Sequence, residues 1–166
     1  MYYTEIEQTN IFKDENMADK IDTDTKKLML RKQPCFSQLR EEEIEILASL
    51  LVEKHVSPGE IIVKEGDPVD SVYLIVSGKA DVRCIKDRNH PDQTESVATL
   101  IPGDAIGLNE TGFYSLSGIR TATVIAIDEM VLLRLSVAAF HGFALAYSHV
   151  NEVMRSYARK LLGMNT

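Results

Sequence analysis

The stretch EGDPVDSVYLIVSGK, residues 65–79, decides the fold class of this chain. It opens with a turn signal, Glu65-Gly66-Asp67-Pro68, and closes with another, Ser77-Gly78-Lys79, because glycine and proline punctuate regular structure. Between the two turns, apolar residues at positions 72, 74 and 76 alternate with those at 73 and 75. A short run of this composition, bounded by turns, predicts a β-strand.

The same pattern recurs through residues 53–135. Further turns are indicated at Pro58-Gly59 and at Pro102-Gly103-Asp104. The polar stretch 87–94 reads as an exposed hairpin loop. Short strands at this spacing, separated by glycine turns, are typical of a sandwich or barrel. The predicted strands are residues 61–64, 71–76, 80–86, 96–100, 121–127 and 130–135.

Helical patterns lie on both sides of this β region. Residues 1–20 are interpreted as a mobile arm or one marginal helix, and residues 21–52 as helices, the second of them spanning Arg40 to Val52. Ser136 is a suitable N-cap for the helices of residues 136–163. We therefore expect one domain over residues 21–163, mainly β with flanking helices: N-terminal helices, a β-barrel over 53–135, and two C-terminal helices.

Composition narrows the class of protein further. The chain has 166 residues, 45% of them hydrophobic, and a net charge of −7. This acidic balance argues against direct nucleic-acid binding, which needs a basic face. The longest nearly apolar stretch, Val137 to Tyr147, is much shorter than the roughly 20 residues that cross a membrane. Cys35 and Cys84 form no disulfide framework, so we interpret both as buried reduced thiols and expect a cytoplasmic location.

No catalytic or metal-binding motif is visible in the sequence. None of the four histidines shares a short motif with another ligand or a nucleophile. His141 and His149 would face roughly the same side of one helix, and we interpret them as unrelated surface or packing residues. We therefore predict that the chain is not an enzyme and that it carries no metal or cofactor.

An anion-binding site is the chemistry that the sequence does offer. Between Ile101 and Val124 a loop begins at Gly107 and ends at Arg120. Backbone N–H groups following Gly107 would point at a bound anion, and the Arg120 guanidinium would form a charge-assisted pair with it. The alternative is a surface loop followed by a strand with a solvated arginine.

Five segments in this order and spacing resemble the cyclic nucleotide-binding domain family. That family includes protein kinase regulatory subunits, nucleotide-gated channels and catabolite activator-type regulators. The similarity extends from about Leu28 to Leu162. The matching segments are residues 34–39, 57–62, 65–78, 102–104 and 120–123.

The resemblance implies an eight-stranded jelly-roll barrel that binds cAMP or cGMP through a phosphate-binding cassette. Arg120 matches the arginine that pairs with the cyclic phosphate, Gly107 the glycine that opens the cassette, and Ala122 its small residue after the arginine. Thr121 is similar to the hydroxyl residue of cyclic GMP-selective members. We therefore expect these residues to line the ligand site.

One position departs from the family pattern. The family normally places a glutamate, which bonds the ribose hydroxyl, directly after the cassette glycine, whereas this chain has Leu108 there, followed by Asn109 and Glu110. We include all three in the candidate site, with Glu110 as a substitute acceptor if the longer cassette shifts it. Tyr157 and Arg159 are candidates to cover the base, although Tyr157 also belongs to the stripe on which the last helix would pack.

Two functions remain open from the sequence. The first is a non-catalytic sensing module that signals through its C-terminal helix, which could also form a dimer. The second is a degenerate cyclic nucleotide-binding scaffold that serves as an interaction or regulatory module without nucleotide. A transcription regulator would need a helix-turn-helix after the long helix, and none precedes Thr166. We therefore expect the output to pass through a protein partner or a further effector domain.

Overall fold

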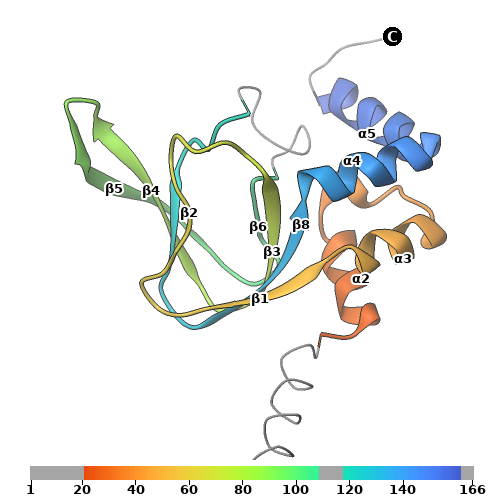
Figure 1. Ribbon diagram of the computed structural model, residues 1–166, viewed down its shortest axis with the longest axis horizontal. Coiled ribbons are helices and arrows are strands. Elements are labelled where there is room, and N and C mark those ends of the chain that lie inside the picture. Colours follow the sequence, from red (N-terminus) through yellow and green to blue (C-terminus); the bar gives the residue numbers. More distant parts are fainter. Residues whose placement is uncertain (1–20, 109–117, 162–166) are drawn as a thin grey trace, which may run out of the picture.

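The computed structural model describes residues 21–108 and 118–161, except for the side chains of residues 157, 158, 160 and 161. Its eight strands form two four-stranded antiparallel sheets (Figure 1). One sheet has the order β1 (Val52–Val56), β8 (Met130–Ser136), β3 (Ser71–Ser77), β6 (Ala105–Ile106). The other has the order β2 (Ile61–Val63), β7 (Thr123–Ala126), β4 (Ala80–Asp87), β5 (His90–Leu100). This arrangement confirms the mainly β fold with eight strands and flanking helices.

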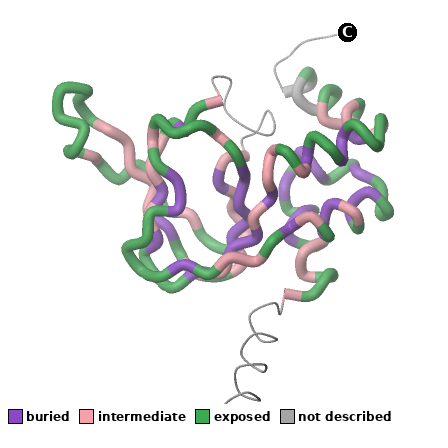
Figure 2. Tube along the Cα trace, in the orientation of Figure 1, coloured by how far each residue is buried: buried purple, intermediate pink, exposed green. Residues whose placement is uncertain are grey.

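The central strand β3 separates two hydrophobic cores. Val72 and Leu74 on one face pack into a cluster shared with the helices, whereas Tyr73 and Ile75 on the other face pack into the barrel interior. Because successive side chains of a strand point to opposite faces, the alternation in the sequence supplies both cores. Buried residues accordingly follow the strands and also line the facing sides of the helices (Figure 2).

The helices gather at one side of the barrel (Figure 1). They are α2 (Thr23–Arg31), the 3₁₀ turn η1 (Pro34–Phe36), α3 (Glu41–Ser49), α4 (Val137–Ala146) and α5 (Ser148–Leu161). Ser136 caps α4 by accepting a hydrogen bond from the Ala139 N–H at 3.0 Å. Tyr147 is extended, with φ −126° and ψ 92°, and separates α4 from α5. The two expected C-terminal helices are therefore present in the described residues.

Two boundaries differ from the prediction. The helix expected through Val52 ends at Ser49, because Val52 pairs with Arg134 and begins β1. The predicted loop 87–94 is instead mostly strand: β4 runs to Asp87, β5 starts at His90, and the Asp87 carboxylate accepts from the Asn89 N–H at 3.0 Å. Its polar residues lie on an exposed projecting hairpin, where pairing rather than burial determines the structure (Figure 1).

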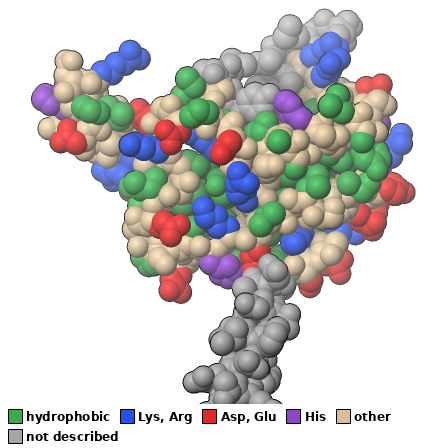
Figure 3. Space-filling model, in the orientation of Figure 1, with side chains coloured by type: hydrophobic (Ala, Val, Ile, Leu, Met, Phe, Trp, Pro, Cys, Tyr) green, Lys and Arg blue, Asp and Glu red, His purple; other side chains and the backbone are tan. Residues whose placement is uncertain are grey.

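The surface carries both signs of charge. On the face shown in Figure 3, acidic and basic side chains are interspersed, with hydrophobic side chains between them. Among the described residues, the helices are all too short or too polar to span a bilayer.

Candidate functional site: a buried arginine in the barrel cavity

Arg120 is held by the same stretch of sequence that decides the fold. Its N–H donates to the Asp67 carbonyl at 2.8 Å, and its carbonyl accepts from the Gly66 N–H at 2.9 Å. Its guanidinium turns inward, where Nη2 donates to the Ser71 carbonyl at 2.7 Å. The turn at residues 65–68 therefore fixes the Arg120 backbone, and the first residue of β3 fixes its side chain.

The Arg120 guanidinium is buried and only partly satisfied. Arg120 is 6% exposed, and its Nη1 has no hydrogen-bond partner among the described residues. Among the described residues, the carboxylate oxygen that pairs with it is Asp70 Oδ1, which lies 3.6 Å from Nη2, and the Asp70 side chain is 74% exposed. Burial lowers the pKa of Arg120 because the charged form loses hydration, while Asp70 opposes that shift. An arginine nevertheless stays protonated in proteins, so an incompletely paired positive charge faces inward.

Gly107 provides the space for this guanidinium. Its φ is +84°, and a Cβ at this position would lie 2.6 Å from Arg120 Nη1 and 3.2 Å from the Ser71 carbonyl oxygen. Both the backbone conformation and the close approach require glycine here. Gly107 and Arg120, which are 13 residues apart in the sequence, are thus in direct contact.

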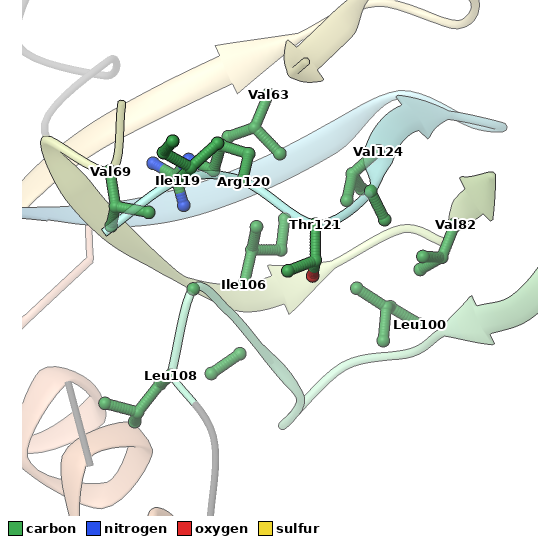
Figure 4. Close-up of a pocket in the computed structure, with 13 residues that line it drawn as sticks. Val63, Val69, Val82, Leu100, Ile106, Leu108, Ile119, Arg120, Thr121 and Val124 are labelled. Carbon is green, nitrogen blue, oxygen red and sulfur yellow. The ribbon is translucent and has the colours of Figure 1, made fainter. Parts of the chain in front are cut away.

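A cavity of about 260 Å³ opens beside these two residues. Figure 4 shows side chains of the barrel strands and of the segments around Gly107 and Arg120 converging on it. Most of its lining is aliphatic, and Arg120 and Thr121 contribute the polar side chains among the described lining residues. The lining residues are Val63, Val69, Val82, Leu100, Ala105, Ile106, Gly107, Leu108, Ile119, Arg120, Thr121, Ala122 and Val124.

Five of the predicted site residues line this cavity together: Gly107, Leu108, Arg120, Thr121 and Ala122. The solvated-arginine alternative is therefore wrong. Asn109 and Glu110 lie outside the described residues.

Leu108 connects the cavity with the helices. It lines the cavity and also packs, half-buried, against the hydrophobic cluster that the helices share with β3 and β8. The sequence departure at this position thus places an apolar side chain between the pocket and that cluster.

The candidates to cover the base stay untested. Arg159 is exposed on α5, and the side chain of Tyr157 is not among those that the structure describes. Val150, on the expected stripe, is 0% exposed, so α5 packs through its first turn.

His149 has a polar partner that the sequence analysis did not identify. Its Nδ1 lies 2.9 Å from both carboxylate oxygens of Glu43, whose side chain is 6% exposed. The extended residue Tyr147 interrupts the helix between α4 and α5. The common face expected for His141 and His149 on one straight helix therefore does not form. No local motif signals a contact between residues 106 positions apart, and only an unexplained acid in the otherwise apolar stripe of α3 could have suggested it.

The two thiols also differ from each other. Cys35 is buried, and burial raises the pKa of its thiol to about 12. Cys84, expected to be buried, is instead half-exposed, with its Sγ 3.7 Å from the Thr121 carbonyl oxygen. Within the described ranges, His, Cys, Asp and Glu form no group of three or more that could hold a metal ion.

The domain is thus a jelly-roll barrel with flanking helices, and its cavity presents a buried arginine beside a glycine. The model of the "Cyclic nucleotide-binding domain" matches residues 53–147. This chain belongs to the cyclic nucleotide-binding domain family.

Relatives and solved structures agree with this assignment. The Pycsar effector protein XpPycTIR of Xanthomonas perforans is 29% identical over 124 residues, which is 69% of this chain and 38% of that protein. A cAMP-dependent protein kinase regulatory subunit of Colletotrichum orbiculare is 32% identical over 67% of this chain and 26% of the relative. The crystal structure of the N-terminal domain of a transcriptional regulator from Streptomyces coelicolor A3(2) superimposes with a TM-score of 0.68 at 27% identity, covering 81% of this chain and 90% of that one. The chain thus spans well under half of the length of the two curated relatives.

Proposed function

We propose that this domain is a non-catalytic sensor that binds a cyclic nucleotide, cAMP or cGMP, with the cyclic phosphate on Arg120. The observation that carries the proposal is the buried Nη1 of Arg120. This atom has no hydrogen-bond partner among the described residues, and Arg120 lines the cavity. A buried charge with unused donors is costly, so a structure that keeps one is suited to an anionic ligand. Membership of the family and the cAMP dependence in the name of one relative support the nucleotide as that anion.

The signal would pass from the cavity to the C-terminal helices through Leu108. A ligand that moves the Gly107–Leu108 segment changes the packing of Leu108 on the cluster to which Phe140 and Val150 also belong. Because a ligand shifts an equilibrium only by its differential affinity for two states, this contact is where the states would differ. A protein partner, an effector domain or a second copy of the chain would then respond to α5.

Calorimetry with cAMP and with cGMP tests the proposal on the wild type and on Arg120→Met. Methionine keeps the apolar stem and removes the charge, so the affinity falls at least about tenfold, as expected for a lost hydrogen bond to a charged group. The melting temperature of the unliganded variant reports two opposing effects, the removal of an incompletely paired buried charge and the loss of the hydrogen bond to the Ser71 carbonyl, and it establishes that the barrel remains folded. Equal affinities of the wild type and the variant would remove Arg120 from the site.

A specific observation favours the second function, a scaffold that no longer binds nucleotide: Leu108 occupies the position of the family glutamate. Two further variants decide between the functions. If the pocket is functional through Glu110, Glu110→Ala weakens nucleotide binding about tenfold and Leu108→Glu adds little. If Glu110→Ala is silent while Leu108→Glu creates binding, the natural domain is an interaction module.

A further inference from the structure

The cavity walls are mostly apolar and offer few hydrogen-bonding groups to a ligand. Of the 13 lining residues, ten have aliphatic side chains, one is glycine, and Arg120 and Thr121 supply the polar ones. Val63 and Val124, from β2 and β7, are almost completely buried, and Val82 lies beside Val124 on the neighbouring strand β4. A surface of this kind binds hydrocarbon by excluding water from it.

The polar end of the cavity is equally simple. The Arg120 Nη2 already donates to the Ser71 carbonyl, so the unused donor is the neighbouring Nη1, next to Gly107. A guanidinium fork suits a planar carboxylate, and the exposed Asp70 is too far away, at 3.6 Å from Nη2, to saturate the charge. The described lining therefore offers one small anion site at the end of an aliphatic chamber.

The edges of the cavity are also aliphatic. Ile119, adjacent to Arg120, lines the cavity and is 46% exposed. Leu108, on the other side of the anion site, presents an aliphatic side chain toward the helical cluster. A ligand that is apolar beyond its anionic head thus needs no other polar partner at either edge.

We infer that this cavity also binds a medium-chain carboxylate amphiphile, with its carboxylate on Arg120 and its hydrocarbon tail along the aliphatic walls. The inference shares the Arg120 anchor with the proposed function but requires no nucleotide. It names a second ligand class, medium-chain fatty acids, for the same chamber. Because the head and the tail meet different parts of the cavity, each part can be tested separately.

Calorimetric titration with hexanoate, octanoate and decanoate, each at concentrations where the acid does not self-associate, tests the tail. Affinity is expected to rise about fourfold for each added methylene, since each one buried contributes about 0.8 kcal/mol. Arg120→Met is expected to weaken decanoate binding at least about tenfold. Decanoate is also expected to displace a fluorescent cyclic nucleotide if that nucleotide binds.

A matched pair of valine substitutions tests the walls. Val124→Thr adds one hydroxyl to the chamber without changing its shape, and should weaken decanoate binding by about fivefold or more because that hydroxyl meets hydrocarbon. Val97→Thr makes the same change on β5, where Val97 is 52% exposed, and should leave binding unchanged. The melting temperature of each variant establishes that the barrel remains folded.

The outcomes separate this inference from the proposed function. Binding that is absent, independent of chain length, or unchanged by Arg120→Met overturns the inference. If cAMP or cGMP binds and decanoate does not, the amphiphile site is wrong and the nucleotide sensor stands. If decanoate binds with the expected chain-length dependence and neither nucleotide binds, the inference stands and the proposed function is wrong.

Discussion

Substituting Gly107 by alanine tests the geometry on which the whole site depends. At φ +84° any residue other than glycine is strained by about 1–2 kcal/mol. The new Cβ would lie 2.6 Å from Arg120 Nη1, so the guanidinium has to leave its place and lose the hydrogen bond to the Ser71 carbonyl, which contributes about 1.5–3 kcal/mol. The two effects together predict a loss of about 2.5–5 kcal/mol in the free energy of unfolding.

Gly59→Ala is the matched control. Gly59 has the same φ of +84°, but a Cβ there meets nothing within 4 Å, so this variant isolates the backbone strain. At about 2–4 °C per kcal/mol for a chain of this size, the melting temperature should fall about 2–8 °C for Gly59→Ala and about 5–20 °C for Gly107→Ala.

Differential scanning calorimetry measures the melting temperatures, and titration with cAMP or with decanoate measures the state of the site. Only Gly107→Ala should weaken ligand binding, by at least about tenfold, because only that variant displaces the arginine. Equal thermal losses for the two variants, together with unchanged ligand binding by Gly107→Ala, would refute the contact between Gly107 and Arg120.

Three further predictions concern stability and reactivity. Gly78→Ala should lower the unfolding free energy by about 2–5 kcal/mol in denaturant titrations, well beyond the control substitution above, because its Cβ would lie 2.9 Å or less from backbone atoms of Glu129 and Met130; a loss no larger than that of the control would contradict the packing described. In the native protein a thiol reagent at pH 8 should modify Cys84 and leave Cys35 unmodified until unfolding, because the Cys35 thiol is buried with a pKa of about 12; equal reaction rates would contradict this. His149→Ala should lower the free energy of unfolding by about 1–3 kcal/mol, because the buried Glu43 carboxylate loses that partner. A double-mutant cycle with Glu43→Gln should show a coupling energy between the two positions, whereas strict additivity would exclude their interaction.

Local chemistry made much of the fold predictable. The alternation of residues 71–76 and the glycine turns around it define β3, and the side-chain oxygen of Ser136 defines the start of α4. The loop between Gly107 and Arg120 indicates an anion site, the resemblance favours that interpretation over a solvated arginine, and the structure places the two residues in contact. The nucleotide-binding role of these residues stays a prediction.

What could not be predicted depends on partners distant in the sequence. Val52 continues the apolar pattern of α3, and its pairing with Arg134 makes it a strand residue. The pairing of His149 with Glu43 likewise results from the packing of α5 on the N-terminal helices, which no local pattern encodes. The polar segment 87–94 resembles a loop in sequence because hydrogen bonding along an exposed hairpin leaves no hydrophobic signature.

The pairing of β1 with β8 has a consequence for synthesis. β1 ends at Val56, and its partner strand begins only at Met130, so the cluster that α2 and α3 share with β3 and β8 stays incomplete until that later segment is made. At about 5–20 residues per second, this interval lasts several seconds on a ribosome. During this interval, part of the apolar faces of α2 and α3 is exposed to other molecules in the cell. Early helices that depend on late strands make this a domain for which chaperone access during translation matters more than the folding speed of any single element.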